Sequence, residues 1–382
     1  MAQKHKAGKP DLILLFTSCI LLAIGLIMVL SASSLFAFNQ TGNSYSYFFK
    51  QVQWALLGII AAFGALITPY RYWKKLSGLG IILSIGLLLL LKYSGLAVEA
   101  KGSVRWLNIF GISIQPSEVA KLFVVIFLAH TLTRYPVKKL KDVFLPLVIT
   151  GIIVFYVYKQ PDLGTAIVIL AVCGIMFLMT ELSSLYFLAA IPICGIAGYY
   201  LVKSEPYQWN RILSWLDPWK YASTLGWQSV NAQIALGTGG LFGIGIGRGV
   251  ESGNLPENFT DMIFAVIGQE FGFFGTFFVI ICFSIFFGRA YFISHQCPDR
   301  FGRLLGFGLT SLLAVQTVIN LGVVTGLLPI TGISLPLISY GGSSLLVTLL
   351  EIGILLNISR YRENQRLKNN ISSNNNVNNV YT

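Results

Sequence analysis

The sequence predicts an all-α polytopic membrane protein with ten transmembrane helices, both termini in the cytoplasm and a large extracytoplasmic loop between helices 7 and 8. The first observation is composition: 55% of the 382 residues are hydrophobic and 11% are charged, against about 25% charged residues in an average soluble domain. The second is a series of apolar segments, and the third is the uneven distribution of Lys and Arg between them. The net charge of +12 does not indicate nucleic-acid binding, because the basic residues form no run of five or six like charges.

The apolar segments are long enough to cross a bilayer, which takes about 20 residues, or fewer where flanking side chains reach the interface. They span approximately residues 12–34, 52–68, 77–92, 117–133, 143–158, 163–180, 185–202, 261–287, 304–325 and 341–358. Within the first segment, the run LILLFTSCILLAIGLIMVL follows basic residues and precedes the small residues SAS, as a signal peptide would. This run of 19 residues exceeds the about 7–15 residues of a cleavable signal, so we expect it to remain as the first helix.

The orientation follows from the basic residues, because positive charge is retained on the cytoplasmic side of a membrane protein. With the N-terminus inside, the inner segments hold 17 Lys and Arg residues and the outer segments hold 9. The remaining one, Lys121, lies within a predicted helix. Both termini are therefore expected in the cytoplasm, which agrees with an even number of spans.

Three outer connections are long, at residues 93–116, 203–260 and 326–340. Loops held by a rigid scaffold commonly carry function, so we expect the site on the outer face. The chain divides into a cytoplasmic N-terminal tail (1–11), a ten-helix membrane domain (12–360) that includes the large loop 203–260, and a cytoplasmic tail (361–382). This second tail is rich in Asn and has no apolar periodicity, so we expect it to be disordered.

The large loop opens with WNRILSWLDPWKYASTLGWQ, in which apolar residues recur at helical spacing beside charged ones. This pattern predicts an amphipathic helix in the outer membrane interface, with a packed lid without lipid contact as the alternative. GTGGLFGIGIGRG follows, with seven glycines from Gly237 to Gly249, and matches neither nucleotide-binding glycine motif. We expect these glycines to bring backbone close to backbone or to a bound headgroup, with Arg248 as the local positive charge.

Asp261 lies in PENFTDMIFAVIGQEFG, where the polar loop meets an apolar run. A carboxylate at a helix start interacts favourably with the macrodipole, by about 0.3–1 kcal/mol, and Glu257 four residues earlier fits such a start. The alternative role is a proton acceptor. It is favoured because Asp261 directly adjoins an apolar membrane segment and follows a glycine-rich and aromatic outer loop. Glu270 does not pair with Asp261, because nine residues place it on the opposite helix face and about 13 Å deeper. We expect Glu270 to be a buried, hydrogen-bonded helix residue.

The segment GSVRWLNIFGISIQPSEVAKLF contains a second group of polar residues. Glu118 and Lys121 share a helix face, and an ammonium one turn inside a membrane helix needs a partner, so we expect an ion pair between them. Helix capping is the alternative role for Glu118. Arg105 is available on the same outer loop for an anionic group. For Asp162, in KQPDLGTA, capping of the following helix is favoured.

Neither a metal site nor a disulfide is indicated. Four of the five cysteines lie inside apolar segments and Cys297 lies in a basic loop, without ligand or framework spacing. His5, His130 and His295 are far apart in the predicted topology, which favours neither a metal site nor a Ser-His-Asp arrangement. The segment GLLPITGISLPLISYGGSSL has two prolines and a YGGSS turn, and it predicts a broken, re-entrant connection that faces protein or water.

The residues alone predict an outward polar cavity near Asp261, Glu118 and Lys121, with Arg105 and Arg248 nearby, and they leave enzyme and transporter open. Five ordered motifs, however, jointly resemble one family. They are RW and QPSE-x2-K between residues 105 and 121, PDLGT at 161–165, DPW at 217–219, LPE-x2-TD-x-IFA at 255–265 and LP-x-ISYGGSSL at 335–345. Together they resemble the SEDS proteins (shape, elongation, division and sporulation), the FtsW, RodA and SpoVE type, over roughly residues 12–360.

This resemblance implies a glycosyltransferase of the bacterial cytoplasmic membrane that polymerises lipid II, an undecaprenyl-pyrophosphoryl disaccharide pentapeptide, into peptidoglycan strands during division or elongation. Asp261 matches the family's essential aspartate and would deprotonate the acceptor hydroxyl, which attacks the donor anomeric carbon with inversion. Arg105, Arg248 and Lys121 paired with Glu118 would contact the pyrophosphate. The resemblance firmly implies no cofactor. A divalent cation would be compatible with the reaction, but the sequence contains no evident cluster of ligands for one. The implied partners are a class B penicillin-binding transpeptidase and other divisome or elongasome membrane proteins.

The sequence departs from the family at Phe259, where members commonly have a histidine before the Thr-Asp pair. No histidine contribution is therefore expected at that step. DPW, GIGIGRGVE and the ending LLNISR favour the division and sporulation type, whereas KQPDLGTA also occurs in the elongation type. We expect a division-type protein. Two alternatives are kept, a lipid II flippase and a non-catalytic scaffold that positions the transpeptidase.

Overall fold

The computed structural model describes residues 8–93, 97–100, 103–109, 112–134, 137, 139–251 and 259–378. The helices are α1 (Leu12–Thr41), α2 (Ser46–Ile67), α3 (Arg71–Tyr93), α4 (Pro116–Arg134), α5 (Leu140–Tyr158), α6 (Leu163–Leu178), α7 (Ser184–Ser204), α8 (Pro206–Leu216), α9 (Trp227–Thr238), α10 (Arg248–Glu251), α11 (Ile263–His295), α12 (Arg300–Val324) and α13 (Gly342–Asn378). The strands are β1 (Ala97–Ala100), β2 (Ser103–Ile109) and β3 (Ile112–Ile114).

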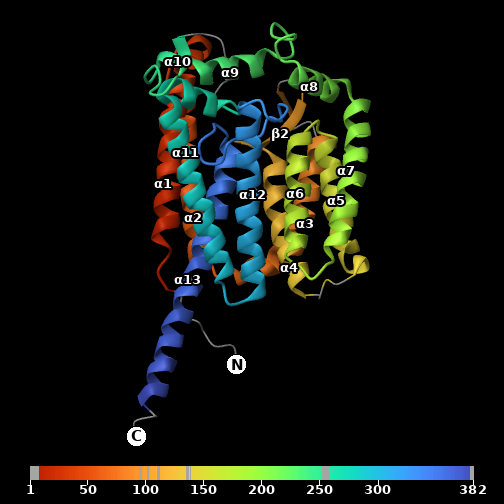
Figure 1. Ribbon diagram of the computed structural model, residues 1–382, viewed down its shortest axis with the longest axis vertical. Helices are drawn as coiled ribbons and strands as arrows, with labels where there is room; N and C mark the ends of the chain where they lie inside the picture. Colours follow the sequence, from red (N-terminus) through yellow and green to blue (C-terminus); the bar gives the residue numbers. More distant parts are fainter. Residues whose placement is uncertain are drawn as a thin grey trace.

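The long helices stand side by side in one bundle (Figure 1). The start of α1 lies beside α13 at one end, where the Gly8 N–H donates to the Arg360 carbonyl over 2.9 Å. We call this the terminal end. The opposite end carries α8, α9, α10 and the sheet, and we call it the loop end (Figure 1).

Eight of the described helices are long and apolar enough to cross a membrane, namely α1, α2, α3, α4, α5, α11, α12 and α13. Two shorter apolar helices, α6 and the Leu188–Ser204 part of α7, complete the bundle. Each of the apolar segments predicted from the sequence falls on one of these helices. The chain is therefore a multi-pass membrane protein, and the crossing of all ten helices stays a prediction.

Two helices extend well beyond the predicted segments. α1 ends at Thr41 rather than at residue 34, because Gly42 adopts the left-handed conformation (φ 71°) and donates its N–H to the Phe38 carbonyl. Glycine has no Cβ to oppose that conformation. α13 continues as helix through Asn378, whereas the sequence predicts a disordered tail from residue 361. Helical hydrogen bonds are local, so a helix that is already formed can propagate beyond the packed bundle.

The interior of the bundle is formed by α4, α12 and α13. In their apolar windows 67%, 67% and 72% of the residues are buried, against 22% in α2. α7 lies at the margin, since almost all its described side chains are exposed and its main neighbour is α8. Of these three helices, α4 and α13 contribute residues to the lining of the site described below, and α12 contributes side chains that hold Lys121 and the Asp261 backbone.

α11 is broken at Gly272, whose backbone (φ 66°, ψ −161°) is not helical. The section before the break, from Ile263 to Glu270, is buried. After the break, Phe273 and Phe277 are about half exposed, at 55% and 49%. The section of α11 before Gly272 thus runs inside the protein, and the start of the section after it faces outward. The residues just before α11 therefore enter the interior at the loop end.

The glycine-rich segment packs against the backbone of this first section. The Ile244 and Gly245 N–H groups donate to the Gln269 and Glu270 carbonyls over 3.0 and 3.1 Å. A Cβ added to Gly243 would lie 2.1 Å from the Glu270 carbonyl oxygen, so only glycine fits. The sequence predicts that these glycines approach either another backbone or a bound headgroup. The structure contains the first of these, a close approach to the α11 backbone.

The sheet corrects the all-α prediction. β1 pairs with β2 and β2 with β3, both antiparallel, with Leu107 opposite Ala97 on one side and Ile114 on the other. Its short strands and a bulge at Val98/Glu99 leave no long alternating pattern in the sequence. The ladder hydrogen bonds satisfy backbone groups in a connection pressed against the bundle.

The connection between α12 and α13 is irregular and enters the bundle, as predicted. Leu335, Ile338 and Ser339 are buried. Its backbone groups find partners in protein: the Tyr340 N–H donates to the Phe259 carbonyl over 2.9 Å, and Gln51 Nε2 donates to the Ser339 carbonyl over 3.1 Å. Irregular backbone of this kind is tolerated at membrane depth when protein groups satisfy it.

α8 packs one face on the same connection. Arg211 Nη1 donates to the Ile330 carbonyl and Trp215 Nε1 to the Gly326 carbonyl, both over 3.0 Å. Its other face leaves Leu216 67% exposed. α8 therefore covers the loop end as a packed lid does, and contact of its exposed face with lipid stays a prediction.

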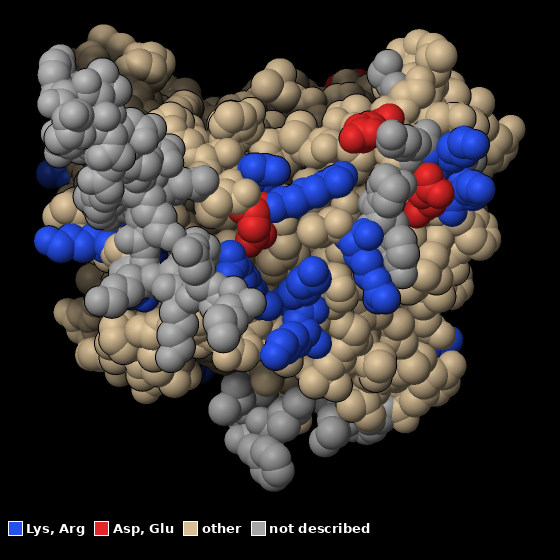
Figure 2. Space-filling view, turned by 90° about the horizontal axis from the view of Figure 1, so that it is seen from below, with Lys and Arg blue, Asp and Glu red and all other residues tan. Residues whose placement is uncertain are grey.

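Lys and Arg side chains gather on the terminal end (Figure 2). This distribution agrees with the charge count that places both termini in the cytoplasm, although the side of the membrane is itself a prediction. His5 and Glu257, considered in the sequence analysis, lie outside the described residues.

Gly243→Ala is expected to lower the apparent Tm of the purified protein in detergent. The alanine would have to adopt φ +82° and would clash with the Glu270 carbonyl, which corresponds to about 1–3 kcal/mol of unfolding free energy for the backbone strain. Gly237→Ala is the matched control, since nothing lies within 4 Å of its added Cβ. Equal Tm values for the two variants would contradict the packing described here.

Candidate functional site

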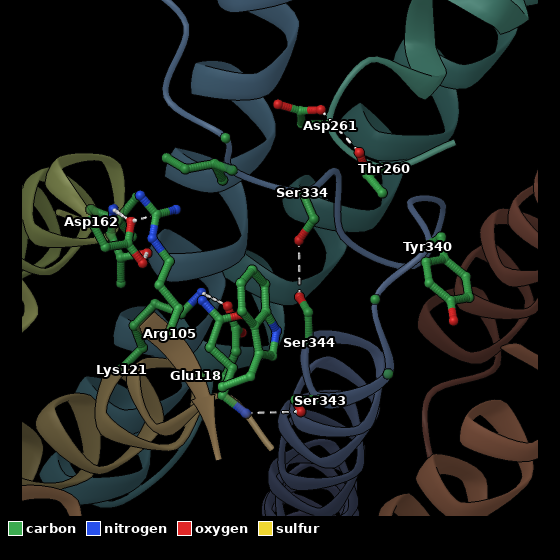
Figure 3. A pocket seen from close by; sticks show the side chains of 18 of the residues that line it. Arg105, Glu118, Lys121, Asp162, Thr260, Asp261, Ser334, Tyr340, Ser343 and Ser344 are labelled. Carbon is green, nitrogen blue, oxygen red and sulfur yellow. Dashed lines mark hydrogen bonds and ion pairs between the residues drawn. The ribbon is translucent and has the colours of Figure 1, made fainter. Parts of the chain in front are cut away.

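A polar cavity of about 650 Å³ lies at the loop end and reaches inward between α4, α6 and α13. Its lining comes from α2, β2, β3, α4, α6, α8, α9, the turn before α11, the connection that leads into α13, and the first turn of α13. Asp261, Arg105, Glu118 and Lys121 all line it. Figure 3 shows Asp261 and Thr260 on one side of the cavity and the other three residues across from them. The structure thus brings together four of the five predicted site residues.

Asp261 presents its carboxylate to this cavity from the turn that precedes α11. Its Oδ1 accepts hydrogen bonds from Thr260 Oγ1 over 3.1 Å and from Gln228 Nε2 over 3.4 Å. Among the described residues, no Lys or Arg forms an ion pair with it. A half-buried carboxylate that is hydrogen-bonded but has no cationic partner retains the capacity to accept a proton from a bound molecule.

The backbone of Asp261 is fixed by Asn320, a residue that the sequence analysis does not identify. Asn320 is buried on α12, and its Nδ2 donates to the carbonyls of Asp261 and Ile333 over 2.7 and 2.8 Å. One side chain therefore joins the turn before α11 to the connection before α13. An isolated asparagine within an apolar helix gives no local signal of this role.

The predicted ion pair between Glu118 and Lys121 is present. Lys121 Nζ lies 2.9 Å from Glu118 Oε1 and donates to Gln316 Oε1 over 3.1 Å. All three side chains are buried, and α13 adds the buried Glu351, which interacts electrostatically with both members of the pair. Gln316 and Glu351 are further residues that sequence reasoning missed, because they lie on helices remote in the chain.

Arg105 lies on β2 and reaches the connection between α5 and α6. Its Nε donates to the Gln160 carbonyl over 3.3 Å, its Nη2 donates to the Pro161 carbonyl, and its Nη1 lies 4.0 Å from Asp162 Oδ1. Asp162 also caps α6, accepting from the Thr165 N–H over 3.2 Å. The predicted capping role of Asp162 is confirmed, and the same residue lines the cavity.

The α13 end of the cavity is rich in small hydroxyl residues. Gly342, Ser343 and Ser344 form the first turn of α13 and line the cavity. Ser344 bonds to Ser334 over 3.0 Å. Arg211 adds a third cation to the lining, held by Tyr207 as well as by the Ile330 carbonyl. A helix start and guanidinium groups are suited to an anionic ligand such as a phosphate.

Arg248 does not line this cavity, which corrects the expected grouping. It begins α10 and is exposed, because the glycine-rich segment follows the α11 backbone to its far side. There the Gly247 N–H donates to Glu270 Oε1 over 3.1 Å, and Ser31 Oγ donates to the same oxygen over 2.6 Å. Glu270 is thus buried and hydrogen-bonded, as predicted, and apart from Asp261.

Phe259 is buried in a cluster of aromatic rings and does not line the cavity. Its ring centroid lies 5.6 Å from Phe36, 4.9 Å from Tyr47 and 5.5 Å from Tyr340. Tyr340 does line the cavity, and burial, with Tyr47 beside it, raises its pKa to about 12. It is therefore a neutral hydroxyl at physiological pH.

Within the described residues, no group of three or more His, Cys, Asp or Glu side chains is placed to hold a metal ion. The chemistry available to the cavity's own side chains is proton acceptance at Asp261 and anion binding at Arg105, Lys121 and Arg211. That combination suits the transfer of a group between a hydroxyl and an anionic leaving group.

Comparisons with known proteins agree with one another. The FtsW, RodA and SpoVE family model, described as Cell cycle protein, matches residues 12–364. Stage V sporulation protein E of Bacillus subtilis is 38% identical over 362 residues, covering 93% of this chain and 98% of its own. The probable peptidoglycan glycosyltransferase FtsW of Geobacter sp. strain M18 is 36% identical and covers 91% of this chain and 96% of its own.

A solved structure of a peptidoglycan synthase complex, described as coordinating polymerization and crosslinking, contains a chain with the same fold. The TM-score is 0.78 and the identity 29%, over 92% of this chain and 98% of that one. The likeness therefore extends over nearly the whole chain.

Lys121→Met is expected to lower the unfolding free energy by about 3–5 kcal/mol, because it leaves a buried carboxylate without its cation. The measurement is the apparent Tm of the purified variant. Glu118→Gln in the same chain is expected to recover part of the loss, since the unpaired charge is then removed. Strictly additive losses in the double variant would show that the two side chains are not coupled.

Proposed function

The chain belongs to the FtsW, RodA and SpoVE family of cell cycle proteins, and from this membership we propose that it is a peptidoglycan glycosyltransferase that polymerises lipid II. The observation that carries the proposal is the carboxylate of Asp261, without a described cationic partner, facing a cavity whose other side is lined by cations. The proposal places the protein in the bacterial cytoplasmic membrane with the loop end outside, in line with the gathering of Lys and Arg at the terminal end.

In the proposed reaction, Asp261 accepts the proton of the acceptor sugar hydroxyl. That oxygen forms a bond to the anomeric carbon of the donor sugar with inversion, and the bond to the lipid pyrophosphate breaks. A general base works within about 2.6–3.2 Å of the proton it removes. One base suffices for this step, which agrees with the separation of Glu270 from the cavity.

The negative charge that develops on the leaving pyrophosphate needs fixed positive groups. We assign this role to Arg105, Arg211 and the Lys121–Glu118 pair, which line the cavity, together with the first turn of α13. Arg248 is exposed outside the cavity, so the proposal gives it no part. Preorganised donors of this kind stabilise transition-state charge more than ground-state charge.

The proposal assigns no step to a resident cofactor. Because the described residues offer no ligand cluster, a divalent cation enters the proposal only as a companion of the substrate pyrophosphate. The proposed partner is a class B penicillin-binding transpeptidase, with other divisome or elongasome membrane proteins. A related chain from a synthase complex supports a partner of this type, and relatives named SpoVE and FtsW support the division and sporulation type.

Asp261→Asn is expected to reduce lipid II polymerisation by about 10²–10⁴-fold, the usual contribution of a general base. The assay reconstitutes the full chain with its transpeptidase in liposomes and follows glycan chains on gels, alongside lipid II translocation. Glu205→Gln is the control, since Glu205 is exposed at the loop end and does not line the cavity.

The alternatives predict different results in the same experiment. A flippase would translocate lipid II without forming polymer, and Asp261→Asn would abolish translocation. A scaffold would form no polymer in this assay, with the wild type or with Asp261→Asn, because neither reconstituted protein would transfer glycan. Either result would overturn the proposal.

Asn320→Ala is expected to lower the turnover number about tenfold with a smaller change in KM. The substitution leaves the carbonyls of Asp261 and Ile333 without their donor and so loosens the position of the base; a buried unsatisfied group costs about 1–3 kcal/mol. Asn231→Ala is the control, because Asn231 Nδ2 donates only within α9, to Trp227. A loss confined to KM would indicate a binding role instead.

A further inference from the structure

A second cavity, of about 400 Å³, lies at the terminal end, where the ends of α6 and α11 meet the start of α12. We propose that it binds the phosphate headgroup of an anionic glycerophospholipid. The site is at the opposite end of the bundle from Asp261 and shares none of its lining residues with the first cavity. It therefore goes beyond the proposed glycosyl transfer.

Basic side chains converge on this cavity from two helices. Arg300 and Arg303 come from the first turn of α12 and His295 from the last turn of α11. Arg303 Nη1 donates to the Cys297 carbonyl over 3.4 Å, which leaves its other donors available. Glu181 is the acidic residue among those lining the cavity, so the lining carries net positive charge and suits an anion.

Arg300 differs from the other arginines of the terminal end. Arg289 forms a bidentate pair with Asp11, with contacts down to 2.6 Å, and Arg71 pairs with Asp299 at 3.5 Å. Arg360 donates to the carbonyls of Gly8 and Leu66. Within the part of the chain that the structure describes, Arg300 is half-buried and has no such partner.

The position of the two arginines on α12 adds to the positive potential. Both lie at the helix start, where the macrodipole is positive and cations are unfavourable, and the first turn contains no acidic residue. Asp299 caps the helix by accepting from the Gly302 N–H, also accepts from Tyr70 and lies beside Arg71, and it forms an ion pair with neither Arg300 nor Arg303. A bound phosphate would relieve this repulsion. The general excess of Lys and Arg on the cytoplasmic side of membrane proteins would explain positive charge at this end. It does not explain why these basic side chains converge on one cavity.

The surroundings of the cavity favour a lipid over a small anion. Leu304 and Phe307 form its apolar wall, and Met179 and Tyr291 at its margin are about half exposed, at 48% and 50%. Leu178, 52% exposed, continues this apolar surface along α6. A headgroup in the cavity would leave its acyl chains on the outward surface of the bundle, where the membrane lies. Basic pockets between helices at the cytoplasmic side are a known mode of anionic lipid binding.

The test measures the apparent Tm of the full chain in detergent with added phosphatidylglycerol, phosphatidylcholine or inorganic phosphate. Phosphatidylglycerol is expected to raise the Tm of the wild type by several degrees, with little effect of the other two. Arg300→Gln combined with Arg303→Gln is expected to lose at least half of that shift. Lys74→Gln combined with Lys75→Gln removes the same charge from the terminal end outside the cavity and should retain the shift.

A shift of wild-type size in the Arg300/Arg303 variant would overturn the proposal, as would an equal loss in the Lys74/Lys75 control. So would an equal shift with inorganic phosphate, which would indicate a site for small anions. If the double variant does not fold, Arg300→Gln alone, read by lipid retention in native mass spectrometry, gives the same decision. Neither measurement involves polymerisation, so failure here and failure of the proposed function are distinguishable.

Discussion

The contact between the glycine-rich segment and the first section of α11 fixes the buried helix that follows the candidate base. Gly243 and Gly239 approach the α11 backbone so closely that a Cβ would lie about 2 Å from carbonyl oxygens, and Gly272 breaks the helix on the other side of the contact. The Glu270 end of the buried section is therefore fixed in position. Asp261 lies before the start of this section, at the edge of the cavity, where Asn320 holds its backbone carbonyl.

Polar groups inside an apolar bundle constrain the rest of the site. Each buried donor or acceptor needs a protein partner, because a membrane interior offers little water to replace one. Lys121 is satisfied by Glu118 and Gln316, and the Asn320 Nδ2 donates to two backbone carbonyls. These bonds tie α4, α12 and the two irregular connections together. The same constraint that stabilises the bundle thus preorganises the cavity.

The two ends of the molecule differ in how they use positive charge. At the loop end, Arg105 and Arg211 are anchored to backbone carbonyls and directed into a polar cavity. At the terminal end, the described Arg71, Arg289 and Arg360 are paired, whereas Arg300 lies in a second cavity beside the outer surface of the bundle. The first arrangement suits the anionic headgroup of the proposed substrate, and the second suits the proposed phospholipid.

The sequence by itself determined the features that depend on local spacing. The apolar segments fix the long helices, the separation of three residues fixes the Glu118–Lys121 pair, and helical geometry separates Glu270 from Asp261. The tertiary structure alone decided the contacts between distant segments. Asn320 reaches a carbonyl 59 positions away and Gln316 an ammonium 195 positions away, and the path of the glycine-rich segment takes Arg248 out of the cavity. Such contacts depend on how helices pack and on which backbone groups lack partners, and neither is encoded in the residues adjacent to them.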